Sequence, residues 1–416
     1  MKILVVGNGG REHCICWKLN ANPKINKIYC APGNGGISLL DKGKNVNINT
    51  LDEIVNFAKT EKIDLTIVGS ETLLVNGIVD KFQENNLKIF GPNKKAAILE
   101  GSKVYSKNFM KKYGVKTAAY EVFNDEQKAK KYIETCDFPI VIKASGLAAG
   151  KGVIICENKT DAFNAINEIM VNKVFENAGE EIVIEEFLEG VEASILSFTD
   201  SKTILPFISA KDHKKIGENE TGLNTGGMGT IAPNPYVTEE VFDEFVNSIM
   251  KPTLNGIIQE EMDFAGVIFF GLMITRKGVY LLEYNMRMGD PETQVVLPLL
   301  KSDFLQLIED AMNKNLSNTI VEWSKKSACC IVLVSGGYPQ SYKKDFEISG
   351  LNDIQSHFFI AGAINKNNTL FTNGGRVLNI VALGDNINIA REKAYNDVAK
   401  VNFNNIYYRK DIGKIK

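Results

Sequence analysis

Residues 280–293, YLLEYNMRMGDPET, bring together side-chain types that suit phosphate chemistry. Because alternate residues of a strand share a face, Leu282 and Tyr284 are expected on one face of a strand here. The opposite face is predicted to carry Leu281, Glu283, Asn285 and Arg287. A carboxylate and an amide oxygen suit Mg²⁺, which bridges phosphates, and a guanidinium pairs a phosphate or carboxylate through two hydrogen bonds. The preceding FAGVIFFGLMI is strongly apolar, which favours a buried sheet over a surface strand with a salt bridge.

A second candidate site is the turn GNGGREH at residues 7–13, which follows the apolar run 3–6. Glycines between a strand and a helix let backbone N–H groups approach a phosphate. A nicotinamide or flavin site is disfavoured, because Glu12 takes the place of the third glycine and the second strand ends YCAPG without an acidic residue. Arg11 and Glu12 beside an anion pocket suit a phosphorylated sugar instead, although a tight turn needs glycines even where nothing binds.

A third candidate is the glycine-rich loop GLAAGKG at residues 146–152. It differs from a Walker A motif, because Ser145 stands at the first glycine position and Gly152 at the Ser/Thr position. Strands are predicted on both sides, at 138–144 and 153–156, so the loop is expected to close over nucleotide phosphates as a lid. Lys143 would reach a phosphate as a point charge. An ordinary hairpin with an exposed lysine explains this stretch, taken alone, about as well.

The elements that must position these groups change character along the chain. The first hundred residues alternate strand candidates with helices that begin near residues 11, 52 and 74, which predicts a parallel sheet covered by helices. Those strand candidates are residues 3–6, 25–30, 64–69 and 87–91. A lysine-rich helix is expected at 103–113.

Farther along, the pattern predicts mainly strands, with one long loop and one long helix. Strands are expected over 181–190, 191–210, 265–275 and 278–285, the last two joined by a turn at Arg276 and Lys277. Residues 211–229 are predicted to be a loop and 238–260 a helix. From about residue 325 the sequence predicts a separate small α+β unit.

Composition excludes several classes of protein. The 416 residues exceed one typical core, so two to four subdomains are expected. A net charge of −2 argues against nucleic acid or an anionic membrane as the main partner. The longest apolar run, residues 265–274, is too short to span a bilayer, and the first run ends at Gly7, which argues against a secretory signal. The seven cysteines lack CxxC spacing and are expected to be reduced thiols in the cytoplasm.

Nine motifs, taken together and in order over essentially the whole chain, resemble the phosphoribosylamine–glycine ligase family of ATP-grasp enzymes. They are GNGGREH, FGPN, LEGSK, VIKASGLAAGKGV, IEEFLEGVEAS, NTGGMG, EYNMRMGDPETQ, SGGYP and NGGRV. The resemblance implies a multidomain α/β and α+β fold. Its expected parts are an N-terminal phosphoribosylamine-binding domain with a parallel sheet (1–102), an ATP-grasp small subdomain with a connecting helix and lid (103–190), an ATP-grasp central subdomain (191–324) and a small C-terminal α+β domain (325–416).

The reaction that this resemblance implies is the ATP-dependent ligation of glycine to 5-phosphoribosylamine. Glycyl phosphate would be the intermediate, and glycinamide ribonucleotide, ADP and phosphate the products, in de novo purine synthesis. ATP would be the co-substrate and Mg²⁺ or Mn²⁺ the metal. The partners would be these small molecules and neither nucleic acid nor a membrane, and the chain is expected to be a cytoplasmic monomer or weak oligomer.

The resemblance also implies roles for individual residues. Glu283 and Asn285 would bind the metal. The nucleotide is assigned to Lys103, Lys143, Gly146, Gly150, Lys151, Gly152, Glu185, Glu186, Leu188 and Glu192. The phosphoribosylamine pocket and the loops closing over it are assigned to Gly9, Gly10, Arg11, Glu12, Gly69, Glu71, Asp212, Lys214, Asn224, Thr225, Gly226 and Gly227. Facing glycine and the acyl phosphate would be Arg287, Gly289 and Asp290, and the catalytic candidates are Arg287, Asp290 and Lys143.

Three alternatives remain open at this point. Another ATP-dependent carboxylate–amine ligase, or a carboxylating relative, would share Lys143, Glu283 and Asn285 but differ in the N-terminal turn and the 212–227 loop. A dehydrogenase would use the first glycine turn, and a non-catalytic module would only bind a nucleotide. The chain also departs from the family pattern at Ser70, usually proline, and at Ser145, where aspartate is common.

Overall fold

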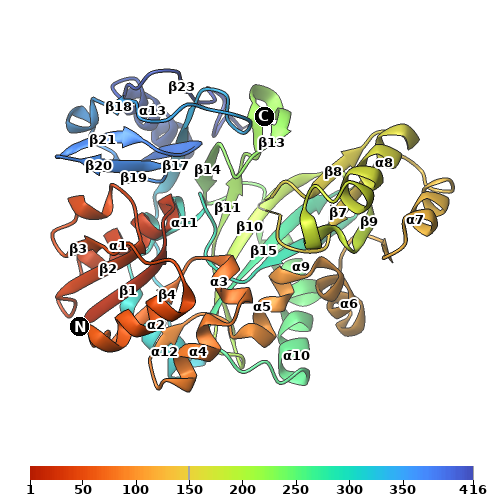
Figure 1. Ribbon diagram of the computed structural model, residues 1–416, viewed down its shortest axis with the longest axis horizontal. Coiled ribbons are helices and arrows are strands. Elements are labelled where there is room, and N and C mark those ends of the chain that lie inside the picture. Colours follow the sequence, from red (N-terminus) through yellow and green to blue (C-terminus); the bar gives the residue numbers. More distant parts are fainter. Residues whose placement is uncertain (149, 416) are drawn as a thin grey trace.

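The computed structural model of this protein describes residues 1–148 and 150–415. Residue 149, within the predicted loop 146–152, and residue 416, within the predicted C-terminal domain, lie outside the described residues. Figure 1 shows an N-terminal unit and a C-terminal unit on one side, and a smaller unit that projects from the opposite side.

The N-terminal unit contains the parallel sheet that the sequence predicts. Its strands, in spatial order, are β3 (Gly43–Asn45), β2 (Lys27–Pro32), β1 (Lys2–Gly7), β4 (Leu65–Val68) and β5 (Ile89–Phe90). The helices between them are α1 (Gly10–Asn20), α2 (Leu51–Thr60), α3 (Glu71–Val75) and α4 (Ile78–Glu84). The helix expected near residue 74 is two short helices, because Gly77 adopts a left-handed conformation, with φ of 86°, between them.

The projecting unit is built on a four-stranded sheet, and the predicted hairpin around the glycine-rich loop is part of it. In spatial order its strands are β6 (Tyr120–Phe123), β9 (Ile182–Glu186), β7 (Ile140–Ala144) and β8 (Val153–Cys156). Strands β7 and β8 pair antiparallel on either side of the loop. Helices α7 (Glu126–Ile133) and α8 (Lys159–Ile166) pack on this sheet. The preceding helices α5 (Lys94–Gly101) and α6 (Lys103–Tyr113) pack mainly against the central sheet. α6 has the bounds that the sequence predicts.

A long sheet runs through the rest of the molecule. Its strands, in spatial order, are β16 (Gly278–Asn285), β15 (Gly266–Thr275), β10 (Val191–Thr199), β11 (Ile204–Asp212), β14 (Gly229–Ala232), β17 (Ser327–Ser335), β22 (Arg376–Gly384) and β19 (His357–Ile360), with β23 (Ile406–Tyr407) beside β17. Its helices are α9 (Glu239–Phe245), α10 (Lys251–Gln259), α11 (Thr293–Leu299), α12 (Phe304–Met312) and α13 (Ile387–Val398). The C-terminal strands thus continue the central sheet through β14 and β17, a connection that the sequence does not predict.

Two small sheets complete the described structure. One, in the C-terminal unit, consists of β18 (Glu347–Ile348), β21 (Thr369–Thr372) and β20 (Ala363–Lys366). The other is the hairpin of β12 (Lys215–Gly217) and β13 (Thr221–Asn224). This hairpin lies within residues 211–229, so the prediction of a loop over that whole stretch is wrong.

An irregularity between β15 and β16 corrects the predicted alternation of side chains. The pairing shifts by one residue at this point, because Gly271 faces Glu283 whereas Leu272 faces Leu281. Leu281 therefore packs in the core together with Tyr284, and Leu282 and Glu283 both line a cavity. The prediction that Leu281 shares a face with Glu283, and Leu282 a face with Tyr284, is wrong. A β-bulge reverses the alternation between these residues.

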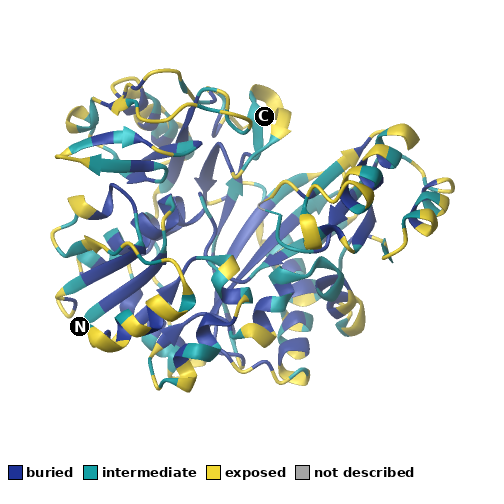
Figure 2. Ribbon diagram, in the orientation of Figure 1, coloured by how far each residue is buried: buried dark blue, intermediate teal, exposed yellow. Residues whose placement is uncertain are grey.

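The buried residues lie mainly in the strands of the central sheet. Figure 2 shows the central strands buried and the outer faces of the surrounding helices exposed. None of the helices in residues 1–148 and 150–415 is both long and apolar enough to cross a bilayer.

Candidate active site

A cavity of about 730 Å³ is lined by residues from every unit of the molecule. Nineteen of the side chains or backbone positions assigned from sequence line it: Gly9, Arg11, Glu12, Glu71, Lys103, Lys143, Gly150, Lys151, Gly152, Glu185, Asp212, Lys214, Asn224, Thr225, Gly226, Glu283, Asn285, Arg287 and Asp290. The three candidate sites recognised separately in the sequence therefore open onto the same space.

The end of β16 carries the carboxylate of Glu283 and the amide of Asn285, and the guanidinium of Arg287 follows directly after it. Arg287 Nη2 donates to Asn285 Oδ1 at 3.3 Å and pairs with Glu100 Oε1 at 3.0 Å. Its Nε is 3.6 Å from Glu71 Oε2. Burial alone would raise the pKa of Glu283, but the surrounding lysines, Lys214 foremost, outweigh it and lower that pKa. Glu283 is therefore a carboxylate at neutral pH.

Glu100 is a buried partner that sequence reasoning missed. Its Oε2 accepts the backbone N–H of Met286 at 2.6 Å, while its Oε1 pairs with Arg287. Glu100 therefore fixes both the backbone and the guanidinium at the end of β16. The motif LEGSK contains this residue, but the acidic side chain alone gave no sign of its partner in a strand far along the chain.

The glycine-rich loop lies beside a group of lysines. Lys103 Nζ donates to the carbonyl of Gly146 at 3.3 Å, and the N–H of Gly146 donates to Ala178 O at 3.0 Å. Lys143 is buried and pairs with Glu185, with 2.9 Å between Nζ and Oε1. Burial lowers the pKa of Lys103, although nearby Glu283 opposes the shift.

At the N-terminal turn, Glu12, which stands in the place of the third glycine, caps α1. The carboxylate accepts the backbone N–H of Gly9 at 2.6 Å and pairs with the Arg11 guanidinium, while both side chains are buried. A Cβ atom at Gly69 would collide with this carboxylate, so the chain after β4 approaches it closely at that position. Arg11 Nη1 also donates to Met288 O at 3.1 Å, which joins the turn to the segment after β16.

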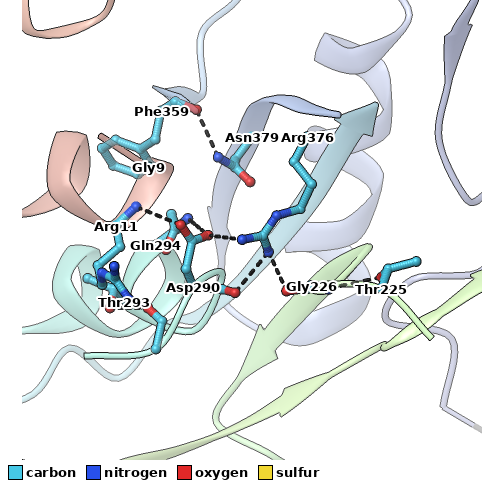
Figure 3. A network of polar contacts seen from close by, with 12 residues as sticks. Gly9, Arg11, Thr225, Gly226, Asp290, Thr293, Gln294, Phe359, Arg376 and Asn379 are labelled. Atoms are coloured by element: carbon cyan, nitrogen blue, oxygen red, sulfur yellow. Dashed lines mark hydrogen bonds and ion pairs between the residues drawn. The ribbon is translucent and has the colours of Figure 1, made fainter. Parts of the chain in front are cut away.

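Asp290 connects three units of the molecule, as Figure 3 shows. Its Oδ1 accepts from Gln294 Nε2 at 2.7 Å and lies 3.4 Å from Arg376 Nη2, while Oδ2 accepts from Arg11 N at 3.3 Å. Arg376 Nη1 donates to Asp290 O at 2.8 Å and to Gly226 O. Burial would raise the pKa of Asp290, but Arg376 and Arg11 outweigh it and lower that pKa. Both carboxylate oxygens are thus already bonded within the protein.

A second group of charges surrounds Lys214. Its Nζ lies 2.7 Å from Glu192 Oε2. Burial would lower the pKa of Lys214, but Glu192, Glu283 and Asp212 outweigh it and raise that pKa. Burial, and then the nearby Glu292, raise the pKa of Asp212 well above its usual value. Ser194 Oγ donates to Glu292 Oε1 at 3.1 Å.

Eight assigned residues lie outside the described lining of the cavity: Gly10, Gly69, Gly146, Glu186, Leu188, Glu192, Gly227 and Gly289. Several of them pack against residues that do line it. Gly227, with φ of 113°, lies against Asp212, and Gly289 O accepts from Thr293 Oγ1 at 2.5 Å. Glu186 Oε1 accepts the N–H of Ala119 at 2.8 Å, at the exposed end of β9.

Besides Glu100, sequence reasoning missed Lys107, Glu292, Tyr338 and Arg376, all of which line the cavity. Tyr338 OH accepts the N–H of Gly226 at 3.0 Å. Glu292, Tyr338 and Arg376 belong to the motifs GDPET, SGGYP and NGGRV, so the signal was present but pointed to no particular role. Lys107 lies one helical turn after Lys103, and that spacing was the available clue.

The donor chemistry fits a Mg²⁺ ion bound together with phosphates. Glu283 and Asn285 supply two hard oxygen ligands on one wall of the cavity, and Mg²⁺ commonly takes one or two protein ligands and completes its shell with phosphate and water. In the described residues, no group of three or more His, Cys, Asp or Glu side chains is arranged to hold a metal. The residues present therefore suit a metal that arrives with a nucleotide.

Three family models match almost the whole chain. The model described as phosphoribosylglycinamide synthetase, N domain, matches residues 1–100. The ATP-grasp (A) domain matches residues 101–293 and the C domain residues 328–415. Among similar proteins, a phosphoribosylamine–glycine ligase of Fusobacterium nucleatum is 58% identical over 100% of this chain and 99% of its own length. Another, of Clostridium acetobutylicum, is 56% identical over the full length of both chains.

Solved structures agree with these matches. A phosphoribosylamine–glycine ligase of Thermotoga maritima has a TM-score of 0.85 and 32% identity, and the alignment covers 99% of this chain and 100% of that one. A biotin carboxylase of Campylobacter jejuni has a TM-score of 0.74 at 14% identity, covering 99% of this chain and 94% of that one, which shows a shared fold alone. With full-length matches in sequence and structure, the chain belongs to the phosphoribosylglycinamide synthetase family, whose central domain is an ATP-grasp domain.

Proposed function

We propose that this protein joins glycine to 5-phosphoribosylamine, with ATP converted to ADP and phosphate, and so forms glycinamide ribonucleotide in purine synthesis. The observation that carries the proposal is that one cavity contains the Arg11–Glu12 turn, the glycine-rich lid with its lysines, and the Glu283–Asn285–Arg287 wall. These are the groups needed to bind a phosphorylated sugar, a nucleoside triphosphate and a carboxylate substrate. The full-length relatives that carry the ligase name support the same reaction.

The proposed chemistry has two steps. A carboxylate oxygen of glycine attacks the γ-phosphorus of ATP, which gives glycyl phosphate and ADP. The amine of phosphoribosylamine then attacks the acyl carbon, the bond to the phosphate oxygen breaks, and the amide forms with loss of a proton. This route needs positioned charges and exclusion of water more than a covalent nucleophile.

The nucleotide is assigned to the side of the cavity below the lid. Lys103, Lys143 and the described residues of the loop 146–152 hold the phosphates. The backbone from Glu185 to Leu188, including Glu186, bonds the adenine at the point where β9 ends and its backbone groups no longer pair with a strand. Glu192 accepts the ribose hydroxyls once it separates from Lys214, to which it is now paired.

The metal is assigned to Glu283 and Asn285, as Mg²⁺ or Mn²⁺. When bound, it would neutralise charge on the phosphates of ATP. Arg287 lies beside these ligands and orients the glycine carboxylate with its Nε, which is buried and makes no hydrogen bond in the described residues. Gly289 lies in the same segment, and a Cβ atom there would collide with Glu292 and Phe269.

Phosphoribosylamine is assigned to the opposite side of the cavity. Its binding residues are Gly9, Gly10, Arg11, Glu12, Gly69 and Glu71, and the covering loops contribute Asp212, Lys214, Asn224, Thr225, Gly226 and Gly227. The bonds of Asp290 to Arg11 and Arg376 support a role in which it holds these parts together next to the reacting groups. We further propose a cytoplasmic monomer or weak oligomer, with domains at 1–102, 103–190, 191–324 and 325–416, which binds neither nucleic acid nor a membrane.

The test is ADP release by the purified protein with ATP, Mg²⁺, glycine and phosphoribosylamine generated in place, each omitted in turn. We expect ADP formation that depends on both co-substrates, and a product with the mass of glycinamide ribonucleotide. ATP binding without turnover, or turnover that does not need phosphoribosylamine, would contradict the proposed substrate and leave another ATP-grasp activity.

A further inference from the structure

Two buried lysines and one buried glutamate form a cluster on the cavity wall beside the glycine-rich loop, and the half-buried Lys103 lies near them. Lys103 and Lys107 come from α6, Lys143 from β7 and Glu185 from β9, and all four line the cavity. Glu185 contacts two of the lysines. Its Oε2 lies 3.2 Å from Lys107 Nζ and accepts from Lys143 Nζ at 3.0 Å, and Lys143 Nζ also lies 2.9 Å from Oε1. The side chains of Lys107, Lys143 and Glu185 are 3%, 8% and 2% exposed, so one buried carboxylate serves two buried ammonium groups.

Lys107 and Lys143 are held differently by the surrounding protein. Lys107 Nζ also donates to Thr117 Oγ1 at 2.6 Å, and that hydroxyl donates to Leu281 O at 2.6 Å. The Lys107 carbonyl accepts from Tyr120 OH at 2.8 Å, which anchors its backbone as well. Within the described residues, the Lys143 ammonium group has one hydrogen-bond partner, the carboxylate of Glu185. Lys107 is thus fixed in place, whereas Lys143 depends on Glu185 and faces the cavity.

The cluster is also short of negative charge. Burial lowers the pKa of Lys107 to about 8, and Lys143 adds to that shift although Glu185 opposes it. An anion entering the cavity would relieve this excess of positive charge. The ammonium nearest to such an anion and least constrained by the protein is that of Lys143.

We propose that Lys107 is a positioning residue, the permanent counter-ion of Glu185 that lets Lys143 transfer its ammonium from Glu185 to a phosphate of the bound nucleotide. The inference rests on the proposed function, in which Lys143 holds the phosphates of ATP. A buried carboxylate that loses its partner is strongly destabilised. With Lys107 in place, Glu185 keeps a partner after Lys143 moves, and without Lys107 the carboxylate retains Lys143.

Binding of three ligands to K107M tests this directly. Isothermal titration calorimetry with ATP, ADP and adenosine compares two ligands that bear phosphates with one that does not. We expect affinity for ATP and ADP to fall about tenfold or more, and affinity for adenosine to stay within about twofold. An equal loss for adenosine would overturn the proposal, because Lys107 would then shape the adenine site. An unchanged affinity for ATP would overturn it too.

Kinetics of two further variants sharpen the test. In K107M the KM for ATP should rise while kcat at saturating ATP changes little, and K107M/E185Q should recover the KM, because the glutamine amide has no charge with which to retain Lys143. K111M is the matched control, since Lys111 is exposed one turn farther along the same helix. A lower kcat with an unchanged KM for ATP would indicate a purely structural role and overturn the proposal.

If K107M does not fold, E185Q carries the test, with tighter binding of ATP and unchanged binding of adenosine as the expected result. Weaker binding of ATP by E185Q would overturn the proposal. Failure of the proposed function is distinguishable, because it would appear in the unsubstituted protein as absent ATP binding or absent substrate-dependent turnover.

Discussion

Glu283 is the side chain on which the proposed metal site depends most. The substitution Glu283→Gln keeps the shape and removes the charge that nearby lysines stabilise. We expect turnover to fall about a hundredfold or more, because metal affinity and charge neutralisation are both lost, with the melting temperature little changed. Glu260→Gln, which alters a pair with Lys112 away from the cavity, is the control. Full activity in E283Q would refute the metal assignment.

His13 gives the protein a predictable sensitivity to acid. Its Nδ1 accepts the N–H of Ile360 at 2.8 Å, and burial lowers its pKa from 6.5 to about 3. Because the folded pKa is the lower one, the unfolded chain binds more protons between these values, and stability is lost as pH falls below 6.5. From pH 7.5 to pH 5 this one group should cost about 2 kcal/mol of the free energy of unfolding.

His13→Asn isolates that contribution, since an amide oxygen can accept the same N–H without titrating. Urea unfolding at pH 7.5 and pH 5 should show a smaller loss of stability in H13N than in the unsubstituted protein, by about 2 kcal/mol. An identical loss in both proteins would show that His13 does not control this range.

At the residue scale, the sequence identified groups with a chemical signature more readily than their supports. Glu283, Asn285 and Arg287 stand out by type and spacing, and the structure places them on one cavity wall. Glu100 and Arg376 were missed because their importance comes from partners far away in the chain, such as Met286 and Gly226. Of the departures from the family pattern, Ser145 Oγ accepts the N–H of Val104 at 3.3 Å, which links the lid strand to α6.

At the scale of helices and strands, the bounds of an element were predicted correctly where local sequence signals mark both of its ends. α6 begins after Ser102, whose Oγ accepts the N–H of Tyr105, and it ends at Gly114, with φ of 71°. The β12–β13 hairpin has no comparable local signal, because Thr221, Gly222 and Leu223 are exposed and lack alternation. The bulge in β16 is also invisible locally, since it arises from the pairing with β15.

The β12–β13 hairpin is held in place by the C-terminal tail. Arg409 is 1% exposed and bonds Lys215 O at 3.0 Å, Glu220 Oε1 at 2.8 Å and the Asp411 carboxylate. Arg409→Ala should destabilise the protein by about 2 kcal/mol, a value reduced for the half-exposed Glu220. It should also speed chymotrypsin cleavage after Leu223, measured by mass spectrometry. Arg276→Ala, at an exposed turn, is the control, and equal cleavage in both variants would contradict this role of Arg409.

At the scale of the whole molecule, Arg376 links the C-terminal unit to the loop at Gly226 and to Asp290. Arg376→Lys keeps the charge but loses the planar guanidinium, whose Nη1 donates to both carbonyls while its Nη2 pairs with the Asp290 carboxylate. We expect kcat/KM for the two co-substrates to fall about a hundredfold while the KM for ATP stays unchanged. Steady-state kinetics with each substrate varied in turn would measure this, and a parallel rise in the KM for ATP would argue against a local effect on the covering loop.

The parallel N-terminal sheet and the β7–β8 hairpin around the glycine-rich loop follow from sequence, because the strand and helix patterns there are local and regular. The continuous sheet from β16 to β19 does not, because the pairing of β14 with β17 joins segments about a hundred residues apart, at Gly229 and Ile331. The same long-range pairing brings Arg376, at the start of β22, to the cavity. Closure of the site thus depends on contacts that no local window of sequence contains.

In the proposed reaction, glycine is activated by phosphorylation of its own carboxylate. Glycine labelled with ¹⁸O in both carboxylate positions, ATP, Mg²⁺ and phosphoribosylamine would be incubated with the protein, and phosphate and product analysed by mass spectrometry. We expect one ¹⁸O in the released phosphate and one in the amide of glycinamide ribonucleotide. Phosphate without ¹⁸O, formed together with the amide, would contradict the glycyl phosphate route.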